Sequence, residues 1–351
     1  MLLSILFILL GFALLVKGGD FLVDGSVAIA QRARLTPIVI GITVVGFGTS
    51  MPEFLVSVQA ALAGSSGIAI GNVAGSNIAN VALILGVTSL IRPLPATRQM
   101  LRTDLPFMLL AMLLFIAAAS YGTINRLMGI AMFSLLVGFI SWEIHHSRKI
   151  TARAVPSSVT SVPTSGHSSP SSSQVSSGLP AETASASSPS SSPMPLWRAI
   201  LLVLISLAAM IWGADLLIKG STDIAREVGQ SLGVDPIALE RIIGLTVIAL
   251  GTSLPELFAS VIAARKGQTD MAIGNIIGSI TFNILSVVGV ASAITPIPNT
   301  WAPFMIDYTI MLFLGILLYI FLITRRSLIR IHGSIFLLIY IAYTLYTSLH
   351  V

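Results

Sequence analysis

A six-residue stretch that occurs twice decides the fold. Its first copy, Gly48-Thr49-Ser50-Met51-Pro52-Glu53, returns as Gly251-Thr252-Ser253-Leu254-Pro255-Glu256. Each copy lies inside a long apolar segment, near 37–61 in the first case and near 237–264 in the second. A charged side chain at the centre of a membrane-spanning helix costs about 2.5–3.5 kcal/mol on insertion scales. Two glutamates in this setting predict a site that needs a counter-charge, a proton or a cation.

The composition indicates a membrane protein. Hydrophobic residues make up 55% of the chain and charged residues only 9%, too few to cover a soluble surface. The basic residues are scattered between apolar runs, which favours topology signals over a nucleic-acid-binding surface. Cysteine is absent, so disulfides and thiolate metal sites are excluded. The apolar run Leu2–Val16 has no basic leader and a related segment recurs at Ile205–Leu217, which argues against a cleaved signal peptide.

Two related halves flank a linker. We predict a first five-helix repeat over residues 1–147, a disordered Ser/Pro-rich linker over 148–196 and a second five-helix repeat over 197–351. The segment after each motif also recurs: Gly71-Asn72, Gly75-Ser76 and Asn80 return as Gly274-Asn275, Gly278-Ser279 and Asn283. The second half carries a longer loop, Arg226–Arg241, before its copy of the motif.

Each half contains five candidate spans. They lie near 2–24, 37–61, 68–90, 104–120 and 124–143, and near 197–218, 237–264, 270–291, 304–323 and 332–350. Because five is odd, the second half enters the membrane in the opposite orientation. The predicted fold is an all-α membrane protein of ten transmembrane helices arranged as two inverted five-helix repeats. Most Lys and Arg residues fall on one side if the N-terminus is outside and the linker is cytoplasmic, in the plasma (inner) membrane. We expect a monomer.

The neighbours of the two glutamates are oxygen donors. Thr49 and Ser50 share a helical face with Glu53, and Thr252 and Ser253 do the same for Glu256. The motif prolines are expected to break the helix and free backbone carbonyls near Gly46 and Ala249. Two polar stripes at i, i+4, i+8 spacing follow, made of Asn72, Ser76 and Asn80, and of Asn275, Ser279 and Asn283. Most other acids lie in loops or near span ends, where we expect them to be solvated or interfacial.

Pooled at the bilayer midplane, these groups suit calcium. Calcium takes roughly six to eight oxygen ligands in a forgiving geometry, and two carboxylates balance a divalent charge. Magnesium dehydrates reluctantly, and soft transition metals would prefer His or Cys, which these spans lack. Sodium could use the same hydroxyls and carbonyls. We expect no cofactor beyond the transported ions.

The paired motif resembles the alpha repeats of the sodium/calcium exchangers of the cation/calcium exchanger superfamily, prokaryotic type, over nearly the whole chain. The resemblance implies a central divalent site at Glu53, Glu256, Asn80 and Asn283. It further implies flanking sodium sites at Gly46, Thr49, Ser50, Ser76, Ala249, Thr252, Ser253 and Ser279. It implies the exchange of several sodium ions for one calcium by alternating access.

Some members carry an Asp at the position of Asn283, notably the potassium-dependent branch, so the Asn argues against potassium co-transport. The short linker departs from the large calcium-sensing loops of animal exchangers. Three alternatives remain. Protons could replace sodium as the coupling ion, the protein could be a passive channel, or Ser50 or Ser253 could be the nucleophile of a hydrolase. The hydrolase alternative lacks a general base, because all five histidines lie at span ends or in the linker.

Overall fold

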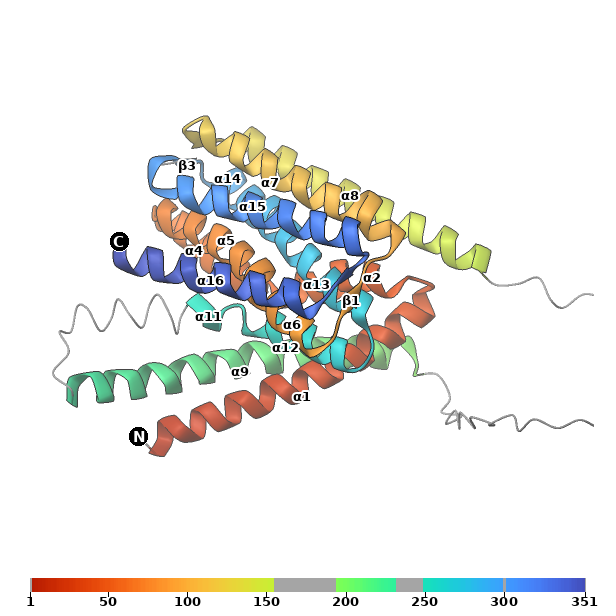
Figure 1. The fold of residues 1–351 in the computed structure, drawn as a ribbon, viewed down its shortest axis with the longest axis horizontal. Coiled ribbons are helices and arrows are strands. Elements are labelled where there is room, and N and C mark those ends of the chain that lie inside the picture. Colours follow the sequence, from red (N-terminus) through yellow and green to blue (C-terminus); the bar gives the residue numbers. More distant parts are fainter. Residues whose placement is uncertain (1, 155–193, 232–248, 299–300, 351) are drawn as a thin grey trace, which may run out of the picture.

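The computed structural model describes residues 2–154, 194–231, 249–298 and 301–350 (Figure 1). In the first half the elements are α1 (Leu2–Ala33), α2 (Pro37–Ile40), η1 (Gly41–Val45), α3 (Gly46–Thr49), α4 (Met51–Leu62), α5 (Ser66–Ala79), η2 (Asn80–Leu85), α6 (Gly86–Ile91), β1 (Leu94–Pro95), η3 (Met100–Asp104), α7 (Leu105–Ser120), β2 (Thr123–Ile124) and α8 (Arg126–Ala154). In the second half they are α9 (Leu196–Ser231), α11 (Ala249–Gly251), α12 (Leu254–Arg265), α13 (Thr269–Phe282), η5 (Asn283–Val288), α14 (Gly289–Ile294), β3 (Ile297–Pro298), α15 (Trp301–Arg325), β4 (Ser327–Leu328) and α16 (Arg330–His350). The η segments are π-helical turns.

The predicted helical membrane fold is confirmed. Among the described residues, seven helices are long and apolar enough to cross a membrane, and the bent pair Pro37–Thr49 and Met51–Leu62 raises the number to eight. The predicted number of ten is not confirmed by the described residues. Helix α16 is not among the seven helices. The first part of the predicted span 237–264 falls outside the described residues.

Three helices run further than predicted. Helix α1 continues to Ala33 and α8 to Ala154. Helix α9 continues to Ser231, so residues 226–231 are helical where a loop was expected, because no proline interrupts the helix there. Residues 232–241 of that loop, and residues 155–193 of the predicted linker, lie outside the described residues.

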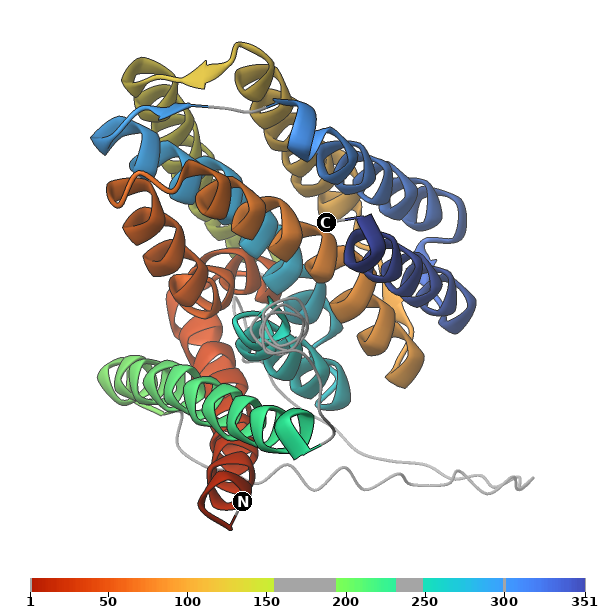
Figure 2. The ribbon, with the colours of Figure 1, turned by 90° about the vertical axis from the view of Figure 1, so that its left-hand side faces the viewer.

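Helices α1 and α9 lie side by side along one edge of the bundle and run in opposite directions (Figures 1 and 2). A Cβ added to Gly11 would lie 2.5 Å from the Gly213 carbonyl, and one added to Gly220 would lie 2.5 Å from the Ser4 carbonyl. Gly25 faces Ala199 at the other end of the seam. Small residues at every seventh position let the two backbones approach closely. The equivalent first helices of the two halves are therefore antiparallel.

Short strands of the two halves also pair with each other. β1 pairs antiparallel with β4, and β2 pairs antiparallel with β3, so each pair joins one strand from each half. Helix α6 meets α16 where Gly86 faces Gly333, and α14 meets α8 where Gly289 faces Gly129. These reciprocal contacts interlock the halves and bring their central helices together.

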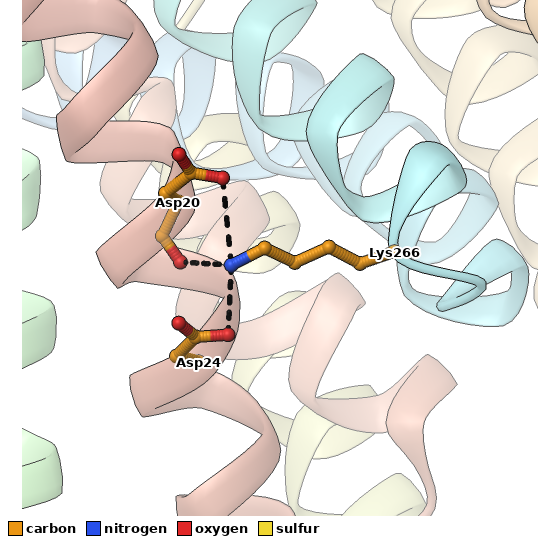
Figure 3. Close-up of polar contacts among 3 residues, drawn as sticks. All are labelled: Asp20, Asp24 and Lys266. Carbon is orange, nitrogen blue, oxygen red and sulfur yellow. Dashed lines mark hydrogen bonds and ion pairs between the residues drawn. The ribbon is translucent and has the colours of Figure 1, made fainter.

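An ion-pair cluster ties α1 to the turn between α12 and α13 (Figure 3). The Lys266 ammonium lies 2.8 Å from the Asp24 carboxylate and 3.5 Å from that of Asp20, and it donates to the Asp20 carbonyl at 2.8 Å. In α9 the counterpart of Asp20, Asp215, instead pairs with Lys219 one turn along its own helix. The two antiparallel helices are thus anchored differently.

Candidate functional site

Both copies of the motif break a helix, as the prolines predict. Ser50 separates α3 from α4 with φ −86° and ψ 8°, and Ser253 separates α11 from α12 with φ −91° and ψ 6°. In the first half the two helical parts meet at an angle of 49°. Each motif glutamate consequently lies in the first turn of the helix after the break, Glu53 in α4 and Glu256 in α12. A helix N-terminus favours a negative charge at this position.

The two glutamates are buried and bonded across the halves. Glu53 is 1% exposed and Glu256 is 0% exposed. The Ser50 hydroxyl donates to Glu256 Oε1 at 2.9 Å, and the Ser253 hydroxyl donates to Glu53 Oε1 at 3.3 Å. Each half therefore supplies a carboxylate and the hydroxyl that orients the other half's carboxylate.

The second oxygen of each carboxylate has no hydrogen-bond partner within the described residues. Glu53 Oε2 and Glu256 Oε2 are both buried and unpaired. The ion pairs found in the same part of the chain engage Lys219 and Lys266, and none reaches either glutamate. A buried carboxylate without a compensating charge is strongly disfavoured. The arrangement requires a proton or a cation at this place.

Asn72 and Asn275 clamp the glutamate helices. The Asn72 amide donates to the Glu53 carbonyl at 3.2 Å and to Ser57 Oγ at 2.8 Å. The Asn275 amide makes the same two bonds, to the Glu256 carbonyl at 3.3 Å and to Ser260 Oγ at 2.9 Å. Both asparagines thus hold the backbone of a glutamate in position. The two serines were missed from the sequence, although each follows its glutamate by four residues in both copies.

Asn80 and Asn283 each begin a π-helical turn, η2 and η5. Such turns occur often at functional sites. Helix α12 packs against η2, and α4 packs against η5, so each asparagine lies next to the other half's glutamate helix. Both amide atoms of Asn80 and the Oδ1 of Asn283 are buried and unpaired within the described residues. Asn77, which has no counterpart in the second half, accepts a bond from the Asn283 amide at 3.3 Å and was not predicted.

The predicted free carbonyl at Gly46 is engaged. It accepts bonds from the Ser50 backbone at 3.2 Å and from the Ser279 hydroxyl at 3.3 Å, because the helix before the break remains closed by i to i+4 bonds. A Cβ at Gly46 would lie 3.0 Å from the Asn275 carbonyl, so α3 packs directly on α13. Thr49 Oγ1 lies within donating distance of Asn275 Oδ1, at 3.2 Å, which adds a further contact between the halves.

The remaining predicted residues are Ser76, Thr252 and Ala249. Ser76 is 5% exposed, and Thr252 is partly exposed beside Ser253. Ala249 lies in α11, and only its backbone is described. Ser76 also lines a cavity of about 270 Å³ with Asn72, and the far wall of this cavity is formed by α15 and α16. The cavity therefore lies against the polar stripe of α5.

A second pair of buried acids lies elsewhere. Acids near span ends were expected to be solvated or interfacial, but Asp104 and Glu143 are both 0% exposed. The expectation was wrong for these two because η3 and α8 pack these ends inside the protein; Gln99 donates to Glu143 at 2.7 Å. In the described part of the chain, no group of three or more His, Cys, Asp and Glu residues could hold a metal ion. A cation bound near Glu53 and Glu256 must therefore use amide, hydroxyl or carbonyl oxygens as well.

Comparisons with known proteins agree with this fold. The family model described as "Sodium/calcium exchanger protein" matches residues 3–144 and 198–349. The inner membrane protein YrbG of Escherichia coli is 32% identical over 331 residues, covering 93% of this chain and 90% of its own length. The sodium/calcium exchanger MaX1 of Methanosarcina acetivorans is 30% identical, with 97% of each chain covered. The solved structure of the sodium-calcium exchanger NCX_Mj superposes with a TM-score of 0.72 at 27% identity, over 97% of each chain.

The helical fold, its apolar spans and the interlocked halves define a membrane transporter. The chain belongs to the sodium/calcium exchanger protein family, because the family model covers most of both halves. The family resemblance predicted from the duplicated motif is thereby confirmed.

Proposed function

We propose that this protein is a secondary active antiporter that exchanges sodium for calcium by alternating access at a site built around Glu53 and Glu256. The observation that carries the proposal is the reciprocal pairing of the glutamates, each with one oxygen bonded to the opposite half's serine and one oxygen unpaired among the described residues. Family membership and the names of the relatives support cation/calcium antiport. Sodium is proposed as the coupling ion because hydroxyl oxygens, which are suitable sodium ligands, lie beside both glutamates.

In this proposal the unpaired oxygens of Glu53, Glu256, Asn80 and Asn283 face the calcium ion. The four supply fewer than the roughly six to eight ligands calcium prefers, so hydroxyls, carbonyls or water complete the shell. Sodium binds the hydroxyl and carbonyl oxygens of Gly46, Thr49, Ser50, Ser76, Ala249, Thr252, Ser253 and Ser279. Both ions neutralise the same carboxylates, so one set excludes the other. This competition couples the two fluxes.

Asn72 and Asn275 act as positioning residues in this mechanism, although the sequence placed them among the ligands. Their amide groups are turned to the glutamate carbonyls, and the Asn275 Oδ1 lies within reach of Thr49. The Asn275 oxygen is thus already engaged by the Thr49 hydroxyl, and the amide group of each asparagine fixes the backbone of a glutamate. The cavity beside Asn72 and Ser76 is a candidate access path for ions.

We further propose the arrangement of the chain in the membrane. Residues 1–147 and 197–351 form two inverted five-helix repeats, and 148–196 form a linker in the cytoplasm, with the N-terminus outside the plasma membrane and the protein a monomer. The antiparallel α1–α9 pair and the paired short strands support the inversion. Because the chain has no cysteine, single cysteines replacing Ser172 and Asn125 can be labelled with a membrane-impermeant maleimide in intact cells. Labelling at position 125 alone would support this orientation. Labelling at position 172 alone would indicate the opposite orientation.

The transport test uses vesicles of defined orientation that contain the full chain. Isotopic calcium uptake is measured with an outward sodium gradient and, separately, with an outward proton gradient. Glu53→Gln and Glu256→Gln should each abolish sodium-driven uptake. Glu143→Gln is the matched control, because it makes the same change at an equally buried glutamate outside the site. Near-normal uptake in both site variants, with the control unchanged, would sink the site assignment.

Proton coupling is the second candidate function. It is favoured by the same buried carboxylates, which have no cationic side chain as partner among the described residues and can carry protons. Uptake driven by the proton gradient and unaffected by sodium would select this candidate. The hydroxyls bonded to the glutamates favour sodium, since hydroxyl oxygens are suitable sodium ligands.

A further inference from the structure

A basic pocket lies away from the candidate site, between the two halves. Its lining includes Arg98 and Arg102 from the segment around η3, and Tyr319, Ile323 and Arg326 from the end of α15 and the turn after it. The pocket has a volume of about 320 Å³. Its floor is held by the β1–β4 pair and by a bond from the Ala96 backbone to the Arg326 carbonyl at 2.8 Å.

The three arginines have no acidic partner among the described residues. None takes part in an ion pair or side-chain hydrogen bond found there, and all three are exposed. The nearest acid in the sequence, Asp104, is fully buried and does not line the pocket. Arg326 adopts a left-handed φ of 52°, as a residue that ends a helix often does. Its position is therefore fixed by the turn between α15 and β4. Three arginines that line one pocket, with no counter-charge among the described residues, have the donors that a phosphate group requires.

An exposed apolar ridge leads away from this pocket along α15. Phe313, Ile316, Ile320 and Ile323 are 51%, 43%, 47% and 49% exposed. Their spacing of three and four residues places them on one face of the helix, and the ridge ends at Ile323, which lines the pocket. A phosphate site joined to an apolar strip of this length matches a phospholipid, with its headgroup at the arginines and an acyl chain along the ridge. The ridge would contribute nothing to the binding of free phosphate.

We propose that this pocket, defined by Arg98, Arg102 and Arg326, binds the headgroup of an anionic phospholipid. Basic pockets between transmembrane helices on the cytoplasmic side commonly bind such lipids, and the pocket is cytoplasmic in the orientation proposed above. The lipid bridges η3 of the first half and the end of α15 of the second half. This site is independent of the ion-binding site and of the identity of the coupling ion.

The test measures lipid binding to the purified full chain in neutral detergent by native mass spectrometry. Phosphatidylglycerol is titrated, with phosphatidylcholine as the zwitterionic comparison and inorganic phosphate as competitor. Arg102→Gln and Arg326→Gln should each weaken phosphatidylglycerol binding about fivefold, since one basic residue near an anionic headgroup contributes on that order. Arg148→Gln is the control, because Arg148 is equally exposed and basic but lies on α8 outside the pocket. It should leave binding unchanged.

Three results overturn the proposal. Equal weakening by Arg148→Gln would indicate diffuse attraction to surface charge. Equal binding of phosphatidylcholine would remove the requirement for an anionic headgroup. Displacement of the lipid by inorganic phosphate at equal concentration would assign the pocket to free phosphate. The elution volume of each variant on size exclusion verifies that these exposed substitutions leave the fold intact.

Discussion

The Ser50 hydroxyl lies 2.9 Å from Glu256 Oε1, although the two residues are 206 positions apart. The reciprocal bond joins Ser253 to Glu53 at 3.3 Å. Together these bonds make each glutamate depend on the other half of the chain for its orientation. A single half would leave its carboxylate without the donor that holds it, which is a physical reason for the motif to occur as a pair.

Removal of either hydroxyl should weaken calcium binding. Ser50→Ala deletes a hydrogen bond to a charged group, worth about 1.5–3 kcal/mol, so the calcium concentration for half-maximal uptake should rise about tenfold or more. Ser253→Ala should act in the same direction. Ser141→Ala provides the control, because the Ser141 hydroxyl bonds only to its own helix, at the Val137 carbonyl, within the described residues. An unchanged calcium dependence in both site variants would contradict the reciprocal arrangement.

The asparagine clamp should affect stability even without ions. Asn275→Ala removes two buried hydrogen bonds, to the Glu256 carbonyl and to Ser260 Oγ, at a combined cost of about 1–3 kcal/mol. Thermal unfolding in calcium-free and sodium-free detergent should show a lower midpoint than wild type. Asn125→Ala, in an exposed turn, should lower it less. A change seen only when ions are present would instead make Asn275 a ligand.

Gly278 should not tolerate a larger residue. A Cβ at Gly278 would lie 2.5 Å from Ile42 Cα and 2.8 Å from the Ile42 carbonyl carbon. Backbone atoms cannot move aside as a flexible side chain can, so Gly278→Ala should reduce the yield of folded protein sharply. Gly138→Ala is the control, because Gly138 is exposed on α8 and a Cβ there would meet no atom of the described residues within 4 Å. Fluorescence-detected size exclusion of the two variants measures the yield, and equal losses in both would contradict the packing at Gly278.

The Lys266 ion-pair cluster should contribute modestly to the free energy of unfolding. Its lysine is 29% exposed and its carboxylate partners 38% and 56% exposed, so the solvent screens the pair. A double-mutant cycle of Lys266→Gln and Asp24→Asn should give a coupling energy of about 0.2–1 kcal/mol that falls as salt is added. A coupling energy that is independent of salt would rule out an electrostatic origin.

Much of the architecture could be predicted because it follows from local signals. The prolines after Ser50 and Ser253 indicate the helix breaks, and the spacing of Asn72, Ser76 and Asn80 indicates the polar stripe. The duplicated sequence identifies which residues belong together. Apolar run length locates most spans, although it stops α9 too early because a polar surface turn of helix resembles a loop.

The features that the sequence did not predict depend on contacts between residues that are far apart in the chain. Nothing local shows that the amide of Asn72 turns to the Glu53 carbonyl. Asn77 has no repeat partner and gives no signal, yet it contacts Asn283. Asp104 resembles an interfacial acid, and only the packing of η3 shows its burial. The basic pocket joins residues 96–102 to 319–326, which no pattern within either segment indicates.

The most direct test of the central claim is isotopic calcium uptake in vesicles under separately imposed sodium and proton gradients, with wild type, Glu53→Gln, Glu256→Gln and Glu143→Gln compared. We predict sodium-driven uptake in wild type and Glu143→Gln, and loss of that uptake in both site variants. Retained sodium-driven uptake in Glu53→Gln and Glu256→Gln would contradict a transport site built on these two carboxylates.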